Sequence, residues 1–277
     1  MFPALFHDGA VVPMTEQGLV IQNLEQVART LVQARYVTAL VGAGMSVESG
    51  IPPFRGPGGL WVRYGEPPMN GFELFLQDPR RWWEATLEDE DHPSRREMRR
   101  ALEQAKPNPG HYALVDLETM GVLRYVISQN VDNLHITAGT QNLAEIHGNR
   151  TKVRCLGCSL RFLKEEFPIL NLPPKCPECG ELMKGDGVMF GEPIPEDVLK
   201  VCFEQSELSD CMIILGTSAV VYPAASLPLH VKQRGGLLVE VNMFNTPLTD
   251  QCDLVLRGPT GGILTRLVER VRELMSR

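Results

Sequence analysis

The chain has 277 residues, of which 43% are hydrophobic and 22% charged, a composition that suits one or two globular domains with a buried core. Its formal net charge is −7, from 27 Lys and Arg against 34 Asp and Glu, so nucleic-acid binding through a basic face is not expected. No apolar run is long enough to span a bilayer and no secretory signal is visible at the N-terminus, so neither a membrane partner nor export is expected.

Apolar residues at helical spacing predict a helix over residues 20–34, followed by a buried strand from Val37 to Val41. The strand ends at Gly42. Because Gly42 and Gly44 lack a Cβ atom, backbone N–H groups here can approach a pyrophosphate, although a plain strand-to-helix turn would also use glycine. A dehydrogenase fingerprint is not complete, since its third glycine is replaced by Val47 and its ribose-binding acid is missing.

A segment rich in Gly and Pro follows, with Phe54-Arg55-Gly56 within it. It predicts a loop that folds over a ligand and offers Arg55 to a phosphate or carboxylate. Residues 80–105 are predicted to be helical with an interruption near His92-Pro93, and Trp82 and Trp83 are expected in the core.

Asn108-Pro109 predicts the start of another helix, which ends at Gly121. His111 lies on this helix and is expected to be structural. Further strands are predicted at residues 124–128, 211–215, 237–241 and 253–256, and further helices at residues 196–208, 224–233 and 262–275. This alternation predicts an α/β fold with a doubly wound, parallel, Rossmann-like sheet.

The predicted strands end in polar or glycine-containing segments. Parallel sheets bind ligands at the carboxyl ends of their strands, so five such ends predict a wide rim for one large ligand. Gln129, Asn130 and Asp132 follow the second strand and suit an amide or ribose hydroxyls. Gly216-Thr217-Ser218 and Asn242 follow the third and fourth strands and suit phosphate or ribose.

Four cysteines form two C-x-x-C pairs, Cys155 with Cys158 and Cys176 with Cys179, separated by 17 residues. This spacing predicts a structural zinc ion with four thiolate ligands, which leaves no open position for catalysis. The alternative is four unrelated cysteines. The other three cysteines are single, and an odd count without an export signal predicts a reducing compartment, the cytoplasm.

His147 precedes the cysteine segment, and Gly148 follows it directly. A neutral imidazole suits a general base, although a single loop histidine is more often structural. Residues 187–192 return from the cysteine segment as a short extended stretch. It could bind an extended peptide through backbone hydrogen bonds or be an ordinary edge strand.

Taken together, these motifs resemble the sirtuins, the NAD-dependent protein-lysine deacylases. The matching stretches are G-A-G-M-S and S-G-I-P-P-F-R-G (42–56), Q-N-V-D-N-L-H (129–135), H-G (147–148), the four cysteines, F-G-E (190–192), G-T-S (216–218), V-Y-P-A-A (221–225) and V-N (241–242). Their order and spacing agree with those of the sirtuins from about residue 24 to the C-terminus.

The resemblance implies a role for each matching residue. His147 is the implied general base, with Asn130 and Asp132 also in the catalytic set. An acylated-lysine protein or peptide is the implied substrate, bound by Val188, Phe190, Gly191, Glu192 and Val221. NAD is the implied co-substrate, bound by Gly42, Ala43, Gly44, Ser46, Phe54, Arg55, Gln129, Asn130, Asp132, Gly216, Thr217, Ser218, Asn242 and Thr260.

The resemblance also implies the domain plan and the reaction. A discontinuous NAD-binding domain comprises residues 1–56, 108–150 and 187–277, a cofactor loop and helical insertion residues 57–107, and a smaller zinc module residues 151–186. The acyl group passes from lysine to ADP-ribose, with release of nicotinamide. ADP-ribosyl transfer or NAD hydrolysis at the same site, or a non-catalytic NAD-sensing module with a zinc ribbon, are the alternatives.

Two departures from the sirtuin pattern bear on substrate preference. The segment before F-G-E usually reads Arg-Pro-x-Val-Val, whereas here it is Lys184-Gly185-Asp186-Gly187-Val188. Sirtuins that prefer acidic acyl groups carry a Tyr-x-x-Arg pair, and the matching positions here are Thr86 and Asp89. Acetyl or other neutral acyl groups are therefore expected to be preferred over succinyl.

Overall fold

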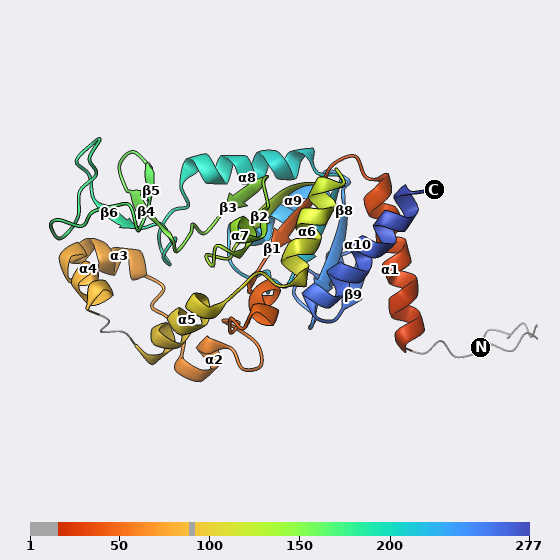
Figure 1. Ribbon diagram of the computed structural model, residues 1–277, viewed down its shortest axis with the longest axis horizontal. Coiled ribbons are helices and arrows are strands. Elements are labelled where there is room, and N and C mark those ends of the chain that lie inside the picture. The colour runs from red at the N-terminus through yellow and green to blue at the C-terminus, as the bar shows by residue number, and fades with distance from the viewer. Residues whose placement is uncertain (1–15, 89–91) are drawn as a thin grey trace, which may run out of the picture.

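The computed structural model describes residues 16–88 and 92–277. The N-terminal residues that bear on a secretory signal, and Asp89, lie outside the described residues. The described part has two lobes, with a parallel sheet between helices in one and the short strands β4–β6 beside helices α3 and α4 in the other (Figure 1). Within this part of the chain, no helix is long and apolar enough to cross a membrane.

The larger lobe is a parallel sheet of six strands in the order β3-β2-β1-β7-β8-β9. Its strands are β1 (Val37–Val41), β2 (Leu123–Ser128), β3 (Leu143–Glu145), β7 (Cys211–Leu215), β8 (Leu237–Asn242) and β9 (Leu254–Arg257). The chain winds from β1 towards β3 on one side and from β7 towards β9 on the other. The order in which the chain adds strands therefore reverses between β1 and β7. Parallel sheets of this kind bind ligands at that point.

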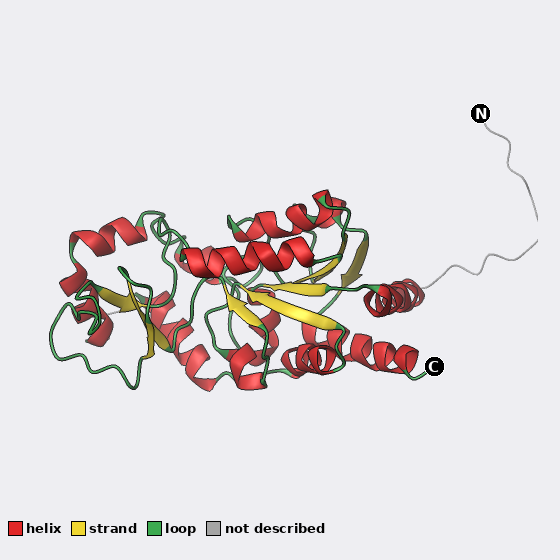
Figure 2. Ribbon diagram, turned by 90° about the horizontal axis from the view of Figure 1, so that it is seen from above, coloured by secondary structure: helices red, strands yellow, loops and turns green. Residues whose placement is uncertain are grey.

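Helices cover both faces of this sheet (Figure 2). The helices of this lobe are α1 (Glu16–Gln33), α6 (Pro109–Thr119), α7 (Leu134–Ala138), α8 (Glu196–Leu208), α9 (Leu227–Gln233) and α10 (Thr260–Met275), with short 3-10 helices η1 (Ala43–Ser49), η2 (Ala224–Ser226) and η3 (Thr249–Gln251). In β1, Val37, Ala39 and Val41 pack with α1, α6 and α10, whereas Leu40 packs with α8 and α9. All five β1 residues are buried, as expected of a strand covered on both faces.

The predicted doubly wound α/β architecture is confirmed, with five strands and most helices close to their expected bounds. Strand β3 was not predicted. It has three residues, only one of which, Ala144, is buried. Its carboxyl end leads through Ile146 to His147, so a sixth strand brings this histidine to the same rim as the other strand ends.

The smaller lobe joins two segments that are distant in sequence. Its elements are α2 (Leu60–Tyr64), α3 (Gly71–Gln77), α4 (Pro79–Leu87), α5 (Pro93–Gln104) and the antiparallel strands β4 (Lys152–Cys155), β5 (Arg161–Leu163) and β6 (Met183–Gly185) in the order β5-β4-β6. Trp83 of α4 is fully buried against Val153, and its indole N–H donates to the Met183 carbonyl at 2.9 Å. The predicted helical insertion and cysteine segment thus share one core.

Candidate active site

Three glycines let the ends of β1 and β7 pack directly against each other. The Gly42 N–H donates to the Leu215 carbonyl at 2.9 Å, and the Gly44 N–H donates to the Gly216 carbonyl at 2.7 Å. A Cβ atom on Gly44 would lie 2.7 Å from both Cα and O of Gly216. These two N–H groups therefore donate to the end of the neighbouring strand and are not free to bind phosphate. The glycines are needed here because the two backbones pack closely.

A chain of polar side chains links the ends of β1 and β2. The Asn130 amide donates to the Gly42 carbonyl at 3.0 Å and to the Ser46 hydroxyl at 3.2 Å, and Ser46 donates to Asp132 at 2.6 Å. The other carboxylate oxygen of Asp132 accepts from the Leu134 N–H at 2.9 Å. Asp132 is buried and holds Ser46, which in turn accepts from Asn130.

The ends of β7 and β8 and the start of α10 complete the rim. The Gln129 amide donates to the Thr217 hydroxyl at 3.0 Å, and the Asn242 amide donates to the Thr217 carbonyl at 2.8 Å. The Thr260 hydroxyl donates to the Gly44 carbonyl at 3.2 Å. One connected set of hydrogen bonds therefore crosses the carboxyl ends of β1, β2, β7 and β8.

His147 stands beside this rim with one ring nitrogen fixed. Its Nδ1 lies 3.1 Å from the carbonyl oxygen of Gln129. Burial lowers the pKa of His147, and the hydrogen bond to Gln129 opposes this only in part. The neutral imidazole is therefore the favoured form near pH 7, which is the form that accepts a proton.

The Gly- and Pro-rich loop after η1 lies against aromatic residues of the smaller lobe. The Arg55 guanidinium sits over the Trp61 ring, 4.1 Å from its centroid, and Phe54 also contacts Trp61, with the ring centroids 5.2 Å apart. Trp61 in turn contacts Phe190, at 5.7 Å. The loop is thus placed next to the 187–192 segment.

Residues 187–192 form no strand, contrary to the edge-strand interpretation. The Val188 N–H donates to the His147 carbonyl at 2.9 Å, and the Phe190 carbonyl accepts from the Phe72 N–H at 3.0 Å. The Glu192 carboxylate points into the protein and pairs with Arg154 and Lys184. The segment is therefore fixed from both lobes.

These elements surround one cleft of about 2470 Å³. A pocket for a single small molecule has about 300–1,000 Å³, so this cleft has room for two ligands. Two residues of the predicted ligand set, Ser46 and Asp132, lie behind its wall. The remaining predicted residues line it, namely Gly42, Ala43, Gly44, Phe54, Arg55, Gln129, Asn130, His147, Val188, Phe190, Gly191, Glu192, Gly216, Thr217, Ser218, Val221, Asn242 and Thr260.

The four paired cysteines converge in the smaller lobe. The Sγ atoms of Cys155 and Cys179 are 3.3 Å apart, those of Cys158 and Cys176 are 3.7 Å apart, and all four lie within 4.8 Å of one another. Four sulfurs at about 2.3 Å from a central zinc ion would be about 3.8 Å apart, so the donor set fits tetrahedral zinc. Cys202, Cys211 and Cys252 belong to other parts of the fold.

Several supporting residues were not recognised from the sequence. Glu48 accepts from the Gly261 N–H at 2.6 Å at the start of α10. The Asn108 amide donates to the Met45 carbonyl at 2.7 Å, in addition to its predicted role as helix cap. Trp61 also lines the cleft. No motif marked Glu48 or Trp61, and the capping motif of Asn108 does not indicate its contact with Met45, because such contacts join residues far apart in the sequence.

Comparison with known proteins identifies the family of the chain. The family described as "Sir2 family" matches residues 42–223. An NAD-dependent protein deacylase of Thermococcus kodakarensis is 44% identical over 259 residues, which cover 91% of this chain and 97% of the relative.

Two solved structures share the fold. A Sir2 homologue in complex with NAD is 42% identical with a TM-score of 0.75, over 91% of this chain and 94% of the other. A Sir2 protein bound to a propionylated peptide is 32% identical with a TM-score of 0.70, over 89% of this chain and 97% of the other. By sequence and by fold, the chain belongs to the Sir2 family.

Proposed function

We propose that this protein is an NAD-dependent protein-lysine deacylase, which transfers the acyl group from lysine to ADP-ribose and releases nicotinamide. The observation that carries the proposal is the position of His147, whose ring is fixed through Nδ1 at the rim of a cleft large enough for two substrates. Relatives named NAD-dependent protein deacylase, and Sir2 structures with NAD and with a propionylated peptide, support it.

In the proposed reaction, the acyl carbonyl oxygen attacks the anomeric carbon of the nicotinamide ribose, and nicotinamide leaves. His147 then takes a proton from a ribose hydroxyl, which captures the acyl carbon, and water completes the transfer. We assign the nicotinamide side to Gln129 and Asn130 and the adenosine side to Gly216, Thr217, Ser218, Asn242 and Thr260. Ser46 and Asp132 act by holding Asn130, since their mutual hydrogen bond lies behind the wall of the cleft.

We further propose that the four cysteines hold one structural zinc ion. Their donor set closes the tetrahedron, so the ion would stabilise the β4–β6 lobe without taking part in the reaction. We also propose a reducing compartment, the cytoplasm, on the odd number of cysteines in the sequence.

For the acyl group, we propose a preference for acetyl or other neutral chains over succinyl. Thr86, at the position matched to the tyrosine of acid-selective sirtuins, donates its hydroxyl to the Trp82 carbonyl of its own helix at 2.8 Å. This hydroxyl is thus engaged within α4 and is not directed at a ligand. Rates with acetyl-lysine and succinyl-lysine versions of one peptide test the preference, and faster desuccinylation would refute it.

The test of the main proposal is product analysis by mass spectrometry with NAD and an acetyl-lysine peptide. We expect free lysine peptide, nicotinamide and acetylated ADP-ribose in equal amounts. Nicotinamide and unmodified ADP-ribose without deacetylation would instead indicate an NAD hydrolase, and a mass gain of ADP-ribose on a protein would indicate a transferase. NAD binding without turnover would indicate a sensing module.

A further inference from the structure

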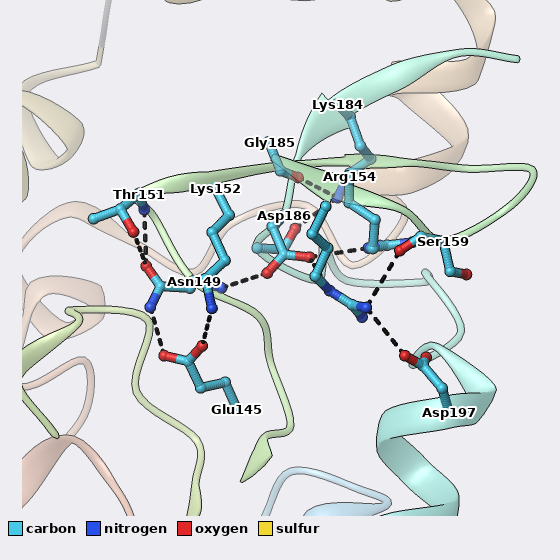
Figure 3. Close-up of polar contacts among 12 residues, drawn as sticks. Glu145, Asn149, Thr151, Lys152, Arg154, Ser159, Lys184, Gly185, Asp186 and Asp197 are labelled. Atoms are coloured by element: carbon cyan, nitrogen blue, oxygen red, sulfur yellow. Dashed lines mark hydrogen bonds and ion pairs between the residues drawn. The ribbon is translucent and has the colours of Figure 1, made fainter. Parts of the chain in front are cut away.

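Four charged side chains are buried together where the turn of residues 147–149, called the His147 turn, meets strands β4 and β6 of the smaller lobe. They are Arg154, Lys184, Asp186 and Glu192, whose side chains are exposed by 5%, 0%, 3% and 2%, respectively. We call this set the Arg154 cluster. Figure 3 shows Asp186 between Asn149 of the His147 turn and Arg154. Neither the proposed reaction nor the zinc ligands account for it.

The register of the smaller sheet explains why the cluster needs two anions. Arg154 of β4 and Lys184 of β6 lie directly opposite each other in an antiparallel pair. Like charges at such positions destabilise a sheet. Glu192 pairs with both cations, since one carboxylate oxygen pairs with Arg154 and the other lies 3.0 Å from the Lys184 Nζ, but its single charge balances only one of them.

Asp186 is the second anion, and it fixes the turn that carries His147. One of its oxygens accepts from the Asn149 N–H at 2.9 Å. The other lies 3.2 Å from the Arg154 Nε, close enough for an ion pair although not aligned as a hydrogen bond, and accepts from Arg161 at 3.1 Å. Gly148 packs on the Asp186 backbone so closely that a Cβ atom there would lie 2.7 Å from the Asp186 carbonyl carbon.

Lys184 and Glu192 fix the other side, the 187–192 segment. The Lys184 Nζ donates to the carbonyls of Gly185 and Gly187 at 2.8 and 2.7 Å, and Glu192 accepts from the Met189 N–H at 2.8 Å. This segment has no strand partner to satisfy its backbone groups. The buried charges take the place of that partner.

We propose that the Arg154 cluster is a positioning element for acyl transfer, which sets the His147 ring relative to the segment that binds the acylated peptide. Buried ion pairs seldom stabilise a protein more than apolar residues of the same volume, so stability alone does not explain four of them. Their directional contacts to Asn149, Gly187 and Met189 do. Glu192 accordingly acts through the cluster rather than by contact with the peptide. This inference rests on the proposed deacylase function.

Two reactions of one enzyme provide the test. Exchange of labelled nicotinamide into NAD, with acetyl-lysine peptide present, reports the first step, which does not use His147. Deacetylation reports the complete reaction, which does use His147. Asp186→Asn directs an NH₂ group at one of its neighbouring N–H donors and removes the charge. A misplacement of His147 by about 1 Å can cost on the order of 100-fold in rate. We therefore expect the ratio of deacetylation to exchange to fall at least tenfold.

The matched control is Asp197→Asn, at an exposed carboxylate that pairs with Arg161 and contacts no member of the Arg154 cluster. Its ratio should stay within twofold of wild type. Glu192→Gln should raise the KM for acetyl-lysine peptide about tenfold, with the KM for NAD within twofold, because it loosens the 187–192 segment and not the NAD rim. A purely structural role would instead reduce both reactions by the same factor and leave both KM values unchanged.

Equal losses of exchange and deacetylation in Asp186→Asn overturn the inference, as does an unchanged ratio. If Asp186→Asn does not fold, Arg161→Met decides, since it removes one of the two cations on Asp186 from a side chain that is 25% exposed. We then expect the ratio to fall about threefold, and no fall overturns the inference. A wild-type enzyme without exchange or deacetylation would refute the deacylase function itself, a result distinct from either.

Discussion

The Nδ1 atom of His147 lies 3.1 Å from the carbonyl oxygen of Gln129. A carbonyl oxygen only accepts hydrogen bonds, so Nδ1 carries the proton and Nε2 of the neutral ring has a free lone pair. Burial lowers the pKa of this histidine below its usual 6.5. The base form therefore persists at pH values where an exposed histidine would already be protonated.

This predicts the position of the acid limb in the pH profile. Deacetylation kcat/KM should fall only below pH 6.5, because the neutral form of His147 is lost as the pH drops through its lowered pKa. His147→Ala should lower the deacetylation rate by about 10²- to 10⁴-fold and remove this limb, with nicotinamide exchange retained. An acid limb centred above pH 7, or one that remains in His147→Ala, would contradict the assignment.

The sheet was predictable because most of its strands are short, mainly apolar and bounded by helices with clear periodicity. β1 is the clearest case, since all five of its residues are buried. β3 was not predictable, because three residues of which only Ala144 is buried give no pattern. The motif around His147 was nevertheless recognisable, while the strand that brings it to the rim was not.

The contacts of several motif residues could not be predicted. Gly42 and Gly44 were expected to let backbone N–H groups approach a pyrophosphate, and their sequence did not reveal that their own N–H groups bond to the end of β7. Glu192 was implied to help bind the peptide, and its sequence context did not reveal that its carboxylate is buried with two cations. In each case a residue far along the chain decides the contact, and local sequence carries no information about that partner.

The packing of Gly44 on Gly216 gives a second prediction. In Gly44→Ala the new Cβ atom would lie 2.7 Å from Gly216 backbone atoms, which cannot move as a side-chain end can. We expect a loss of about 1–3 kcal/mol in the free energy of unfolding and a raised KM for NAD. Urea denaturation and NAD titration of the initial rate measure the two effects.

Gly262→Ala is the matched control for Gly44→Ala. Gly262 is an exposed residue of α10, and a Cβ atom there would have nothing within 4 Å. Alanine favours a helix over glycine by up to about 1 kcal/mol, so this variant should be as stable as wild type or more stable, with an unchanged KM for NAD. Gly44→Ala with wild-type stability and KM would show that the two strand ends can separate freely.

A third prediction concerns the cysteine cluster and needs no activity measurement. Trp83 is fully buried in the same core as Cys155 and Cys176. Loss of zinc should loosen this core and shift tryptophan fluorescence to longer wavelength. We expect about one zinc ion per purified chain, and both bound zinc and the native emission should be lost in Cys176→Ser.

The control for Cys176→Ser is Cys252→Ser, at a half-buried cysteine whose thiol donates to the Leu248 carbonyl at 3.3 Å, away from the cluster. Its zinc content and emission should match those of wild type. A purified wild-type chain that holds no zinc and yet keeps a buried Trp83 would contradict the zinc assignment.

The fourth prediction concerns two histidines packed together under the active site. The rings of His111 and His135 have their centroids 4.9 Å apart, and the Nε2 of His111 and both ring nitrogens of His135 lack a hydrogen-bond partner among the described residues. Burial lowers the pKa of His111 to about 4 and that of His135 to about 3. Both rings therefore stay neutral in the folded protein well below pH 6.5.

Since the unfolded chain binds protons at these histidines below pH 6.5 and the folded chain does not, stability is full above pH 6.5 and falls as the pH drops towards 4. Two such groups lower the free energy of unfolding by about 2–3 kcal/mol per pH unit near pH 5. Urea denaturation at pH 7, 6, 5.5 and 5 measures this slope. His135→Leu should remove about half of it, because one titrating ring is lost. An equal slope in wild type and His135→Leu would contradict the assignment.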